Sequence, residues 1–284
     1  MKFVFTLATL LLTLSIAFSA KAVIYGADDR KEVVQMNSPM WSSIADSTVV
    51  ILPGTSLIRA GNIFNFVDEI YGRFYSLCKD EPFLNQPSVG QCSGSLIGEN
   101  LILTAGHCFQ STQDCQDSKF IFNYAVSKSG TSPKGASASE IYSCKRVVSQ
   151  VFDKNALDYA IIELDRPVVG HKPLRLPAAA TDVRTNLNVT IVGNPAGLPT
   201  KVIPNGIVRE VRELSFRASL DSFGGASGAP VFNTENGDLL GIISLGAQDF
   251  QTDPSRGCQE TYKCDQDGCM GEKIIRIEEI LKNH

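Results

Sequence analysis

Three histidines occur in the 284-residue chain, and this scarcity narrows the search for a general base. His284 is the last residue, and His171 lies in a proline-rich stretch where we expect a surface position. His107 follows an apolar run and comes directly after Ala105 and Gly106, whose small size leaves room beside an imidazole ring. We therefore expect His107 to be the residue that accepts and returns protons.

A serine among small residues is the matching candidate nucleophile. Ser227 lies in the segment 224–230, GGASGAP, which favours a tight turn with an open approach. In such a turn the backbone amides of Gly225 and Ser227 can point into one small space and bind the oxyanion of a tetrahedral intermediate. A flexible glycine-serine loop would have the same composition, so this segment alone does not establish a site.

An aspartate at the start of an apolar stretch completes the set. Asp158 directly precedes YAIIEL, the composition of a buried strand. A carboxylate there can hold the ring of His107 in one tautomer and stabilise the imidazolium that forms during attack. Taken alone, Asp158 would equally well cap a turn.

The three segments together resemble the motifs of chymotrypsin-like serine proteases. TAGHC at 104–108 resembles the histidine motif of that family, DYAIIEL at 158–164 the aspartate motif, and GASGAP at 225–230 the serine motif. Their order along the chain is also that of this family and not that of subtilisins or α/β-hydrolases. The resemblance covers nearly all of the chain after residue 22. It implies a protease in which His107, Asp158 and Ser227 are catalytic.

The family pattern also implies a disulfide between Cys92 and Cys108 that braces the histidine loop. Within the family, the chain is most similar to the bacterial glutamyl endopeptidase-like branch. Val23-Ile24 followed by Asp29-Arg30 resembles the mature start of that branch, and the segment 224–233 resembles its serine region.

One departure concerns activation. Trypsins carry an aspartate just before the nucleophile, and it pairs with a new N-terminus after cleavage. Here Ala226 stands at that position, where the bacterial branch usually has asparagine. We therefore expect no trypsin-type zymogen switch, and we expect Val23 to become the N-terminus on signal removal or after trimming.

A second departure concerns specificity. Glutamyl endopeptidases place a histidine on the strand beside the substrate, whereas this chain has ISLG at 243–246, so a preference for glutamate is unsupported. Asp221 lies six residues before Ser227, where trypsins carry the acid that attracts arginine or lysine. Asp221 can instead belong to an Asp-Ser turn found in bacterial relatives of other specificity. The resemblance implies substrate contacts for Asp221, Ser222, Ile243, Ser244 and Gly246.

The elements that must position these residues read as short strands rich in valine, isoleucine and phenylalanine, separated by turn residues. They fall into two blocks. The first is expected at 49–52, 93–97, 101–103, 120–124, 147–152 and 159–164, and the second at 189–192, 206–211, 229–232 and 239–244. A turn at 98–100 suits a hairpin in the first block. The pattern indicates an all-β protein, and the resemblance implies two antiparallel six-stranded barrels.

The domain boundaries follow from these blocks. We expect an N-terminal barrel at 23–166, a connector with three prolines at 167–184, and a C-terminal barrel at 185–284. The only helix that the sequence predicts closes the chain, because Ile274, Ile277 and Leu281 share a helical face. We expect it to dock on the second barrel.

The N-terminus and the cysteines indicate export. Lys2, an apolar run and small residues at Ala20 and Ala22 predict a signal peptide over residues 1–22, and the alternative, a membrane anchor, is disfavoured by the short run. The eight cysteines then predict disulfides. The rival, a metal site on Cys258, Cys264 and Cys269, has the wrong spacing. We expect a secreted or periplasmic protein without a metal or cofactor.

The composition and the charge pattern indicate which classes of partner to expect. The net charge of -4 is spread along an ordinary globular sequence with 43% hydrophobic residues, and no basic run indicates nucleic acid. We expect a monomer that acts on proteins or peptides and, once the signal is removed, does not bind a membrane. Two alternatives stay open: an inactive binding protein on a protease scaffold, and a hydrolase of esters or other acyl donors.

Overall fold

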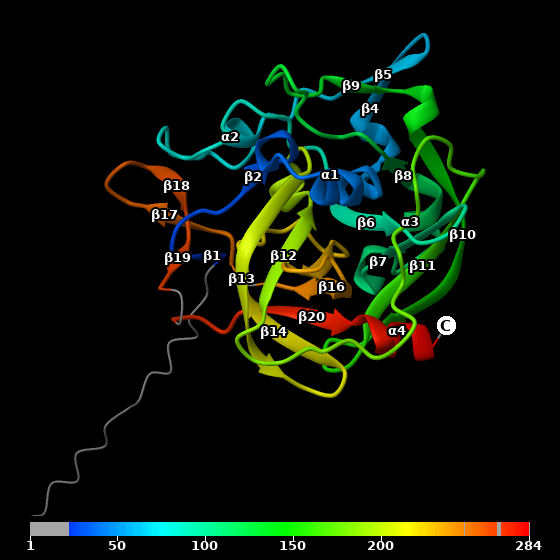
Figure 1. Ribbon diagram of the computed structural model, residues 1–284. Helices are drawn as coiled ribbons and strands as arrows, with labels where there is room; N and C mark the ends of the chain where they lie inside the picture. Colours follow the sequence, from blue (N-terminus) through cyan, green and yellow to red (C-terminus); the bar gives the residue numbers. More distant parts are fainter. Residues whose placement is uncertain (1–22, 247, 266–267, 284) are drawn as a thin grey trace, which may run out of the picture.

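The computed structural model describes residues 23–246, 248–265 and 268–283, and within them two antiparallel barrels lie side by side (Figure 1). The first barrel closes in the order β10-β11-β7-β6-β3-β8. Its strands are β3 (Thr48–Pro53), β6 (Cys92–Leu96), β7 (Leu101–Thr104), β8 (Ser118–Ile121), β10 (Ile141–Phe152) and β11 (Asp158–Leu164). The predicted hairpin turn at 98–100 joins β6 to β7, which pair antiparallel.

The second barrel closes in the order β12-β15-β16-β20-β14-β13, because β12 also pairs with β13. Its strands are β12 (Asn188–Gly193), β13 (Lys201–Val211), β14 (Ser215–Ser219), β15 (Pro230–Asn233), β16 (Leu239–Leu245) and β20 (Glu272–Arg276). The predicted chymotrypsin-like, all-β architecture of two six-stranded barrels is confirmed.

The strand β11 shows why its sequence is apolar on both faces. Ala160 and Ile162 point into the first barrel, whereas Tyr159 and Ile161 pack between the barrels with residues of the second one. Side chains of a strand alternate between its faces, and both faces of β11 are covered. Asp158, the first residue of β11, is therefore held at the junction of the two barrels.

The N-terminal segment lies against the second barrel and not the first. β1 (Ile24–Tyr25) pairs with β19 (Lys263–Cys264), and β2 (Lys31–Glu32) pairs with β13. The predicted boundaries grouped this segment with the N-terminal barrel. Two further small sheets lie outside the barrels, formed by β17 (Phe250–Asp253) with β18 (Cys258–Thr261) and by β4 (Leu57–Ala60), β5 (Ile63–Phe66) and β9 (Gly135–Ser137).

The helix prediction was partly wrong. Ile274 lies on β20, where it packs inside the second barrel while Ile275 faces the first, and the closing helix α4 begins only at Ile277 (Ile277–Lys282). Three other helices were not predicted: α1 (Pro39–Asp46), α2 (Tyr71–Phe74) and α3 (Thr112–Asp117). The start of α1 has a clear signal, because the hydroxyl of Ser38 accepts from the amide of Trp41 and proline follows at the first helical position. Single 3-10 turns lie at Val33–Met36, Gly54–Ser56, Gly106–Cys108, Ala138–Glu140 and Pro195–Gly197.

All eight cysteines form disulfides, as predicted, which leaves no sulfur for the alternative metal site. The pairs are Cys78–Cys258, Cys92–Cys108, Cys115–Cys144 and Cys264–Cys269. The predicted signal peptide lies outside the described residues. Within the part of the chain that is described, no helix has the length and apolar character needed to cross a membrane.

The position of His171, in the connector between the barrels, was predicted wrongly. His171 is only 9% exposed, not on the surface as expected. Its two ring nitrogens face the carboxylates of Asp46 and Glu140 at 2.9 and 2.8 Å, and the ring stacks on Phe122. His171 thus attaches the connector to the first barrel. Both of its ring nitrogens are engaged in these contacts, so its role is structural.

Candidate active site

A buried carboxylate holds the imidazole of His107. Oδ2 of Asp158 lies 2.8 Å from Nδ1 of His107, and Oδ1 accepts the backbone amide of His107 at 2.9 Å. The hydroxyl of Ser244 donates to Oδ2 at 2.7 Å. Asp158 is fully buried, whereas the ring of His107 keeps 22% of its side-chain surface exposed. The imidazole is fixed from behind and open in front.

The protonation of this pair follows from its contacts. Burial by itself would raise the pKa of Asp158, but the hydrogen bonds from His107 and Ser244 hold that pKa below its ordinary value. Asp158 is therefore ionised at neutral pH, and Nδ1 of His107 must carry the proton that it donates. In the neutral form of the ring, the nitrogen that can accept a proton from a nucleophile is then Nε2.

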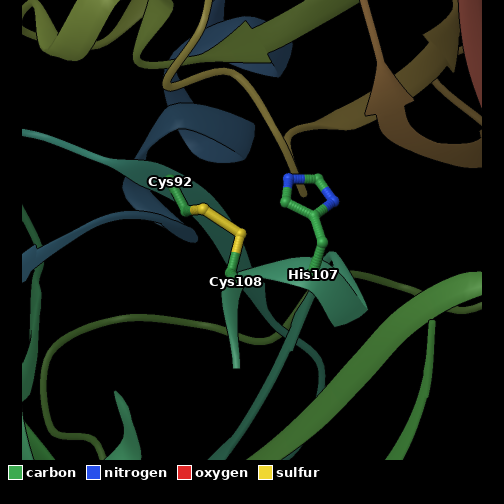
Figure 2. A group of neighbouring side chains, drawn as sticks. All are labelled: Cys92, His107 and Cys108. Atoms are coloured by element: carbon green, nitrogen blue, oxygen red, sulfur yellow. A yellow bond between two sulfur atoms is a disulfide. The ribbon is translucent and has the colours of Figure 1, made fainter. Parts of the chain in front are cut away.

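The turn that presents His107 is fixed by a disulfide and by a glycine. Figure 2 shows His107 and Cys108 next to each other on one turn, with Cys108 bonded to Cys92 on the neighbouring strand β6. A side chain at Gly106 would collide with the carbonyl of Val151, so only glycine fits there. The two sulfurs and one ring nitrogen of His107 lie within 4.8 Å of one another, but the sulfurs are bonded to each other and do not form a metal site.

The turn around Ser227 packs directly on the strands that lead to His107. The carbonyl of Ser227 accepts the amide of Ser93 on β6 at 2.8 Å. Gly228 has a φ of 83°, and a side chain there would collide with the carbonyl of Ser93 and the hydroxyl of Thr104. Thr104 lies three residues before His107. This close approach therefore brings the turn at 224–228 (the serine turn) next to the turn at 106–108 (the histidine turn).

The backbone of the serine turn leaves two donors free. Within the described part of the chain, the amides of Gly225 and Ser227 donate to no acceptor, whereas the amide of Ala226 between them bonds to the carbonyl of Phe223 at 3.0 Å. Gly225 has a φ of 91°, and its carbonyl accepts the hydroxyl of Ser93 at 2.8 Å. Two unpaired amides on either side of a fixed peptide are suited to binding an oxyanion.

Asp221 has a different environment from the one expected of a pocket acid. It is 4% exposed, and its two oxygens accept the backbone amides of Tyr25 and Asp29 at 2.9 and 2.7 Å. Burial raises its pKa to about 7, against the effect of those two hydrogen bonds. The carboxylate thus anchors the N-terminal segment, and both oxygens are already in use.

The N-terminal segment also contacts the serine turn through Arg30, which sequence reasoning missed. The guanidinium lies 4.1 Å from the ring centroid of Phe223 and donates to the carboxylate of Asp28. Asp249, also missed, accepts the amide of Gly224 at 2.9 Å. Only the charged triplet at 28–30 was visible in the sequence. The Phe223 ring that Arg30 contacts lies about 190 residues further along the chain, and no local sequence pattern predicts such a contact.

The other predicted substrate residues lie in two kinds of place. Ser222 and Ile243 are each 2% exposed, and the carbonyl of Ile243 accepts the amide of Gly228 at 2.8 Å. Ile243 therefore supports the serine turn from behind, and Ser222 is buried in the segment that leads into that turn. Gly246 is exposed beside the carboxylate of Glu272, at the end of the strand on which Ser244 lies.

Comparison with known proteins identifies the family of the chain. Residues 92–242, more than half of the chain, match the family model of the trypsin-like peptidase domain. The chain belongs to the trypsin-like peptidase family. It is 30% identical over 151 residues to glutamyl endopeptidase of Bacillus licheniformis, covering 51% of this chain and 46% of that protein. It is 26% identical over 165 residues to trypsin Blo t 3 of Blomia tropicalis, covering 56% and 58%.

Solved structures of this trypsin-like fold are also similar. The VesB protease of Vibrio cholerae has a TM-score of 0.54 at 15% identity, over 90% of this chain and 66% of that one. An inactivated protease paralogue of the scabies mite, S-D1, has a TM-score of 0.54 at 14% identity, over 91% and 94%. At these identities the likeness concerns the fold alone. The chain spans about half the length of the curated relatives that it matches.

Proposed function

We propose that this trypsin-like peptidase is an active serine endopeptidase with Ser227, His107 and Asp158 as its catalytic residues. The observation that carries the proposal is the fully buried Asp158, which bonds both the ring and the backbone amide of His107. Such a carboxylate stabilises an imidazolium at the place where the serine turn meets the histidine turn.

The reaction follows from the roles of these groups. Oγ of Ser227 attacks the scissile carbonyl while Nε2 of His107 accepts the hydroxyl proton. The negative charge that forms on the carbonyl oxygen is bound by the amides of Gly225 and Ser227. His107 then gives its proton to the leaving amine, and water releases the acyl group with His107 again as the base. Every step uses groups of this chain, and we expect no cofactor.

The test is cleavage of a complex peptide mixture by the purified, disulfide-bonded protein. We expect wild type to produce new peptide termini and the Ser227→Ala variant to produce none above background. Ser227 is half-buried at the surface of a turn, so its alanine variant retains the fold and serves as a matched control. Equal patterns from the two proteins would contradict the proposal.

A second candidate function is binding without catalysis. One similar structure is described as an inactivated protease paralogue, so this fold also exists in inactive forms. Here Ser227, His107 and Asp158 are all present, which favours catalysis. The binding hypothesis predicts a partner that wild type and Ser227→Ala bind equally and that neither cleaves. An esterase instead predicts turnover of acyl esters while the peptide mixture stays intact.

The preference at the cut is a separate proposal. An arginine or lysine preference requires Asp221 to face the substrate cation, and its bonded oxygens argue against that in this conformation. The similarity to a glutamyl endopeptidase is offset by Ile243-Ser244 in place of the expected histidine. The same peptide mixture decides between them: cuts after arginine or lysine that Asp221→Ala abolishes would support the pocket role, and cuts after glutamate would support the bacterial relative.

Export is proposed on the predicted signal peptide together with four disulfides. Val23 is fully buried, and its amide donates to the carbonyl of Tyr262 at 3.2 Å. A chain that begins there would already be seated on the second barrel. N-terminal sequencing of the exported protein should give Val23 or a nearby residue, and retention of residues 1–22 would contradict this.

A further inference from the structure

A basic hollow lies behind the loop that leads into Asp158. Its volume is about 320 Å³, and its charged lining consists of four cationic side chains and one carboxylate: Lys154, Arg212, Arg217, Lys273 and Glu213. The charge of its lining is thus opposite in sign to the net charge of -4 that the whole chain carries. Such a concentration of cations attracts anions.

The hollow is connected to the catalytic groups by short steps. The loop 153–157 begins after Phe152, whose ring lies 5.7 Å from that of His107, and ends at Asp158. Lys273 donates to the carbonyls of Lys154 and Ala156 in this loop at 2.9 and 3.1 Å. The residues that flank the loop on both sides, Phe152 and Asp158, thus contact His107, and Lys154 and Asn155 in its middle line the hollow.

The hollow also adjoins the strand expected to pair with substrate. On β20, Lys273 lies opposite Leu245, the residue after Ser244. Burial lowers the pKa of Lys273, and the negative charge of Asp158 opposes that shift, so the two groups interact. A peptide lying along residues 244–246 would therefore pass close to the hollow.

The cations of the hollow have few anionic partners. Lys273 uses two of its three N–H donors on neutral carbonyls, and Arg217 donates to the carbonyl of Gly271 at 2.8 Å. Arg217 and Lys273 lie directly opposite each other on neighbouring strands, an arrangement of like charges that costs stability. A bound carboxylate between them would remove that cost.

Four acids lie near these four cations, but among the described residues only Arg212 has a close ion-pair partner. Glu210, on β13, is paired with Arg212 at 2.8 Å and also lies opposite Arg217, Glu213 lines the rim, and Asp158 acts on Lys273. Asp153 acts on Lys273 from the loop. The carbonyls of Arg212 and Glu213 accept from the guanidinium of Arg276 at 3.3 and 3.5 Å, which fixes the turn that carries them. The hollow therefore has a fixed backbone, with Lys273 buried and Arg217 half-buried, whereas Lys154 and Arg212 are exposed at its rim.

From this geometry we infer that the hollow is a substrate subsite for an acidic side chain on the amino-terminal side of the cut. This inference rests on the proposed function. The part of a substrate that stays bound to Ser227 after cleavage is the amino-terminal part, and it is the part expected along residues 244–246. The ligand chemistry is a carboxylate on a peptide, and a free inorganic anion would meet the same groups.

The test compares peptides that differ only by Glu or Gln at the second, third or fourth position before the cut. We expect the ratio of kcat/KM for Glu over Gln to be about three- to fivefold at one position, the size of one partly exposed ion pair. Arg217→Gln and the exposed Lys154→Gln should each bring that ratio toward one. Arg184→Gln, an exposed arginine of the connector paired with Asp182, should leave it unchanged. Added salt should reduce the ratio in wild type.

A binding arm separates this inference from the proposed function. In the Ser227→Ala protein, the Glu peptide should bind more tightly than the Gln peptide, and sulfate or phosphate should compete weakly. If wild type cleaves peptides but all Glu to Gln ratios equal one, the subsite is refuted and the protease stands. If nothing is cleaved but Glu-selective binding is lost in Arg217→Gln, the subsite stands alone. Binding of heparin without any peptide selectivity would also refute it.

Discussion

Removing the hydroxyl of Ser244 should weaken the catalytic arrangement without disturbing its outline. In the Ser244→Ala variant, Oδ2 of the buried Asp158 loses the donor at 2.7 Å and keeps only His107. A hydrogen bond to a charged group contributes about 1.5–3 kcal/mol. We therefore expect the free energy of unfolding at neutral pH to fall by about 2 kcal/mol.

The same change should alter the pH profile of catalysis. A carboxylate with fewer donors has a higher pKa and also holds the proton of the imidazolium more strongly. The active form has an ionised Asp158 and a neutral His107. Both effects cause this form to be lost at a higher pH as the solution is acidified, so the acidic limb of the kcat/KM profile should move to higher pH. If between half and all of the lost ~2 kcal/mol, that is about 1–2 kcal/mol, would have stabilised the transition state, kcat/KM should fall by about 5- to 30-fold.

The measurements are urea unfolding and kcat/KM from pH 5 to 9 on one peptide. Ser95→Ala is the matched control, because Ser95 is also a buried serine of the barrels and its hydroxyl has no partner. It should leave activity and the pH profile unchanged. If Ser244→Ala behaves as Ser95→Ala does, Asp158 is not stabilised in the way described.

Three further changes test other parts of the site. Replacing both Cys92 and Cys108 by alanine opens a loop closed over a sequence separation of 16, and should lower the free energy of unfolding by about 3 kcal/mol in urea titrations; no change would contradict the bracing role. Gly228→Ala forces a side chain onto Ser93 and Thr104 at a φ of 83° and should remove nearly all peptidase activity, whereas wild-type kcat/KM would refute the close approach. Asp221 has a pKa raised to about 7 from 3.8, so the folded state binds its proton more tightly than the unfolded state. Its contribution to stability is thus complete below pH 3.8 and is lost as the pH rises to about 7, by up to about 4 kcal/mol. Asp221→Asn should lack this slope in unfolding curves between pH 4.5 and 7.5, and identical slopes would show that Asp221 does not titrate there.

Local sequence was sufficient to select the residues that we propose as catalytic. His107, Asp158 and Ser227 each lie within a short segment whose small or apolar neighbours are needed for the turn or strand itself. All six strands of the first barrel and four of the second were predicted from their apolar composition, whereas β14 was missed and Ile274 of β20 was assigned to the closing helix. These features require no knowledge of what lies opposite in the fold.

Long-range contacts account for what the sequence did not reveal. The bond from Asp221 to the amide of Tyr25 spans 196 residues, and nothing near either residue indicates it. Ile274 fitted a helical face because its spacing to Ile277 suits a helix as well as the end of a strand. Pairing of β20 with β14 and β16 decides that ambiguity in favour of the strand. His171 was expected on the surface, and its burial depends on Asp46 and Glu140 from two other segments.

The central claim is that Ser227 is a nucleophile activated by His107 and Asp158. The most direct measurement is labelling of the mature, folded protein with a fluorophosphonate, followed by peptide mapping. The account predicts one label per molecule, on Ser227, with loss of peptide cleavage in step with labelling. It also predicts labelling at least about 100-fold slower in His107→Ala, because the general base is gone. No label on wild type that unfolds cooperatively and has all four disulfides, or a label on another serine, would contradict the account.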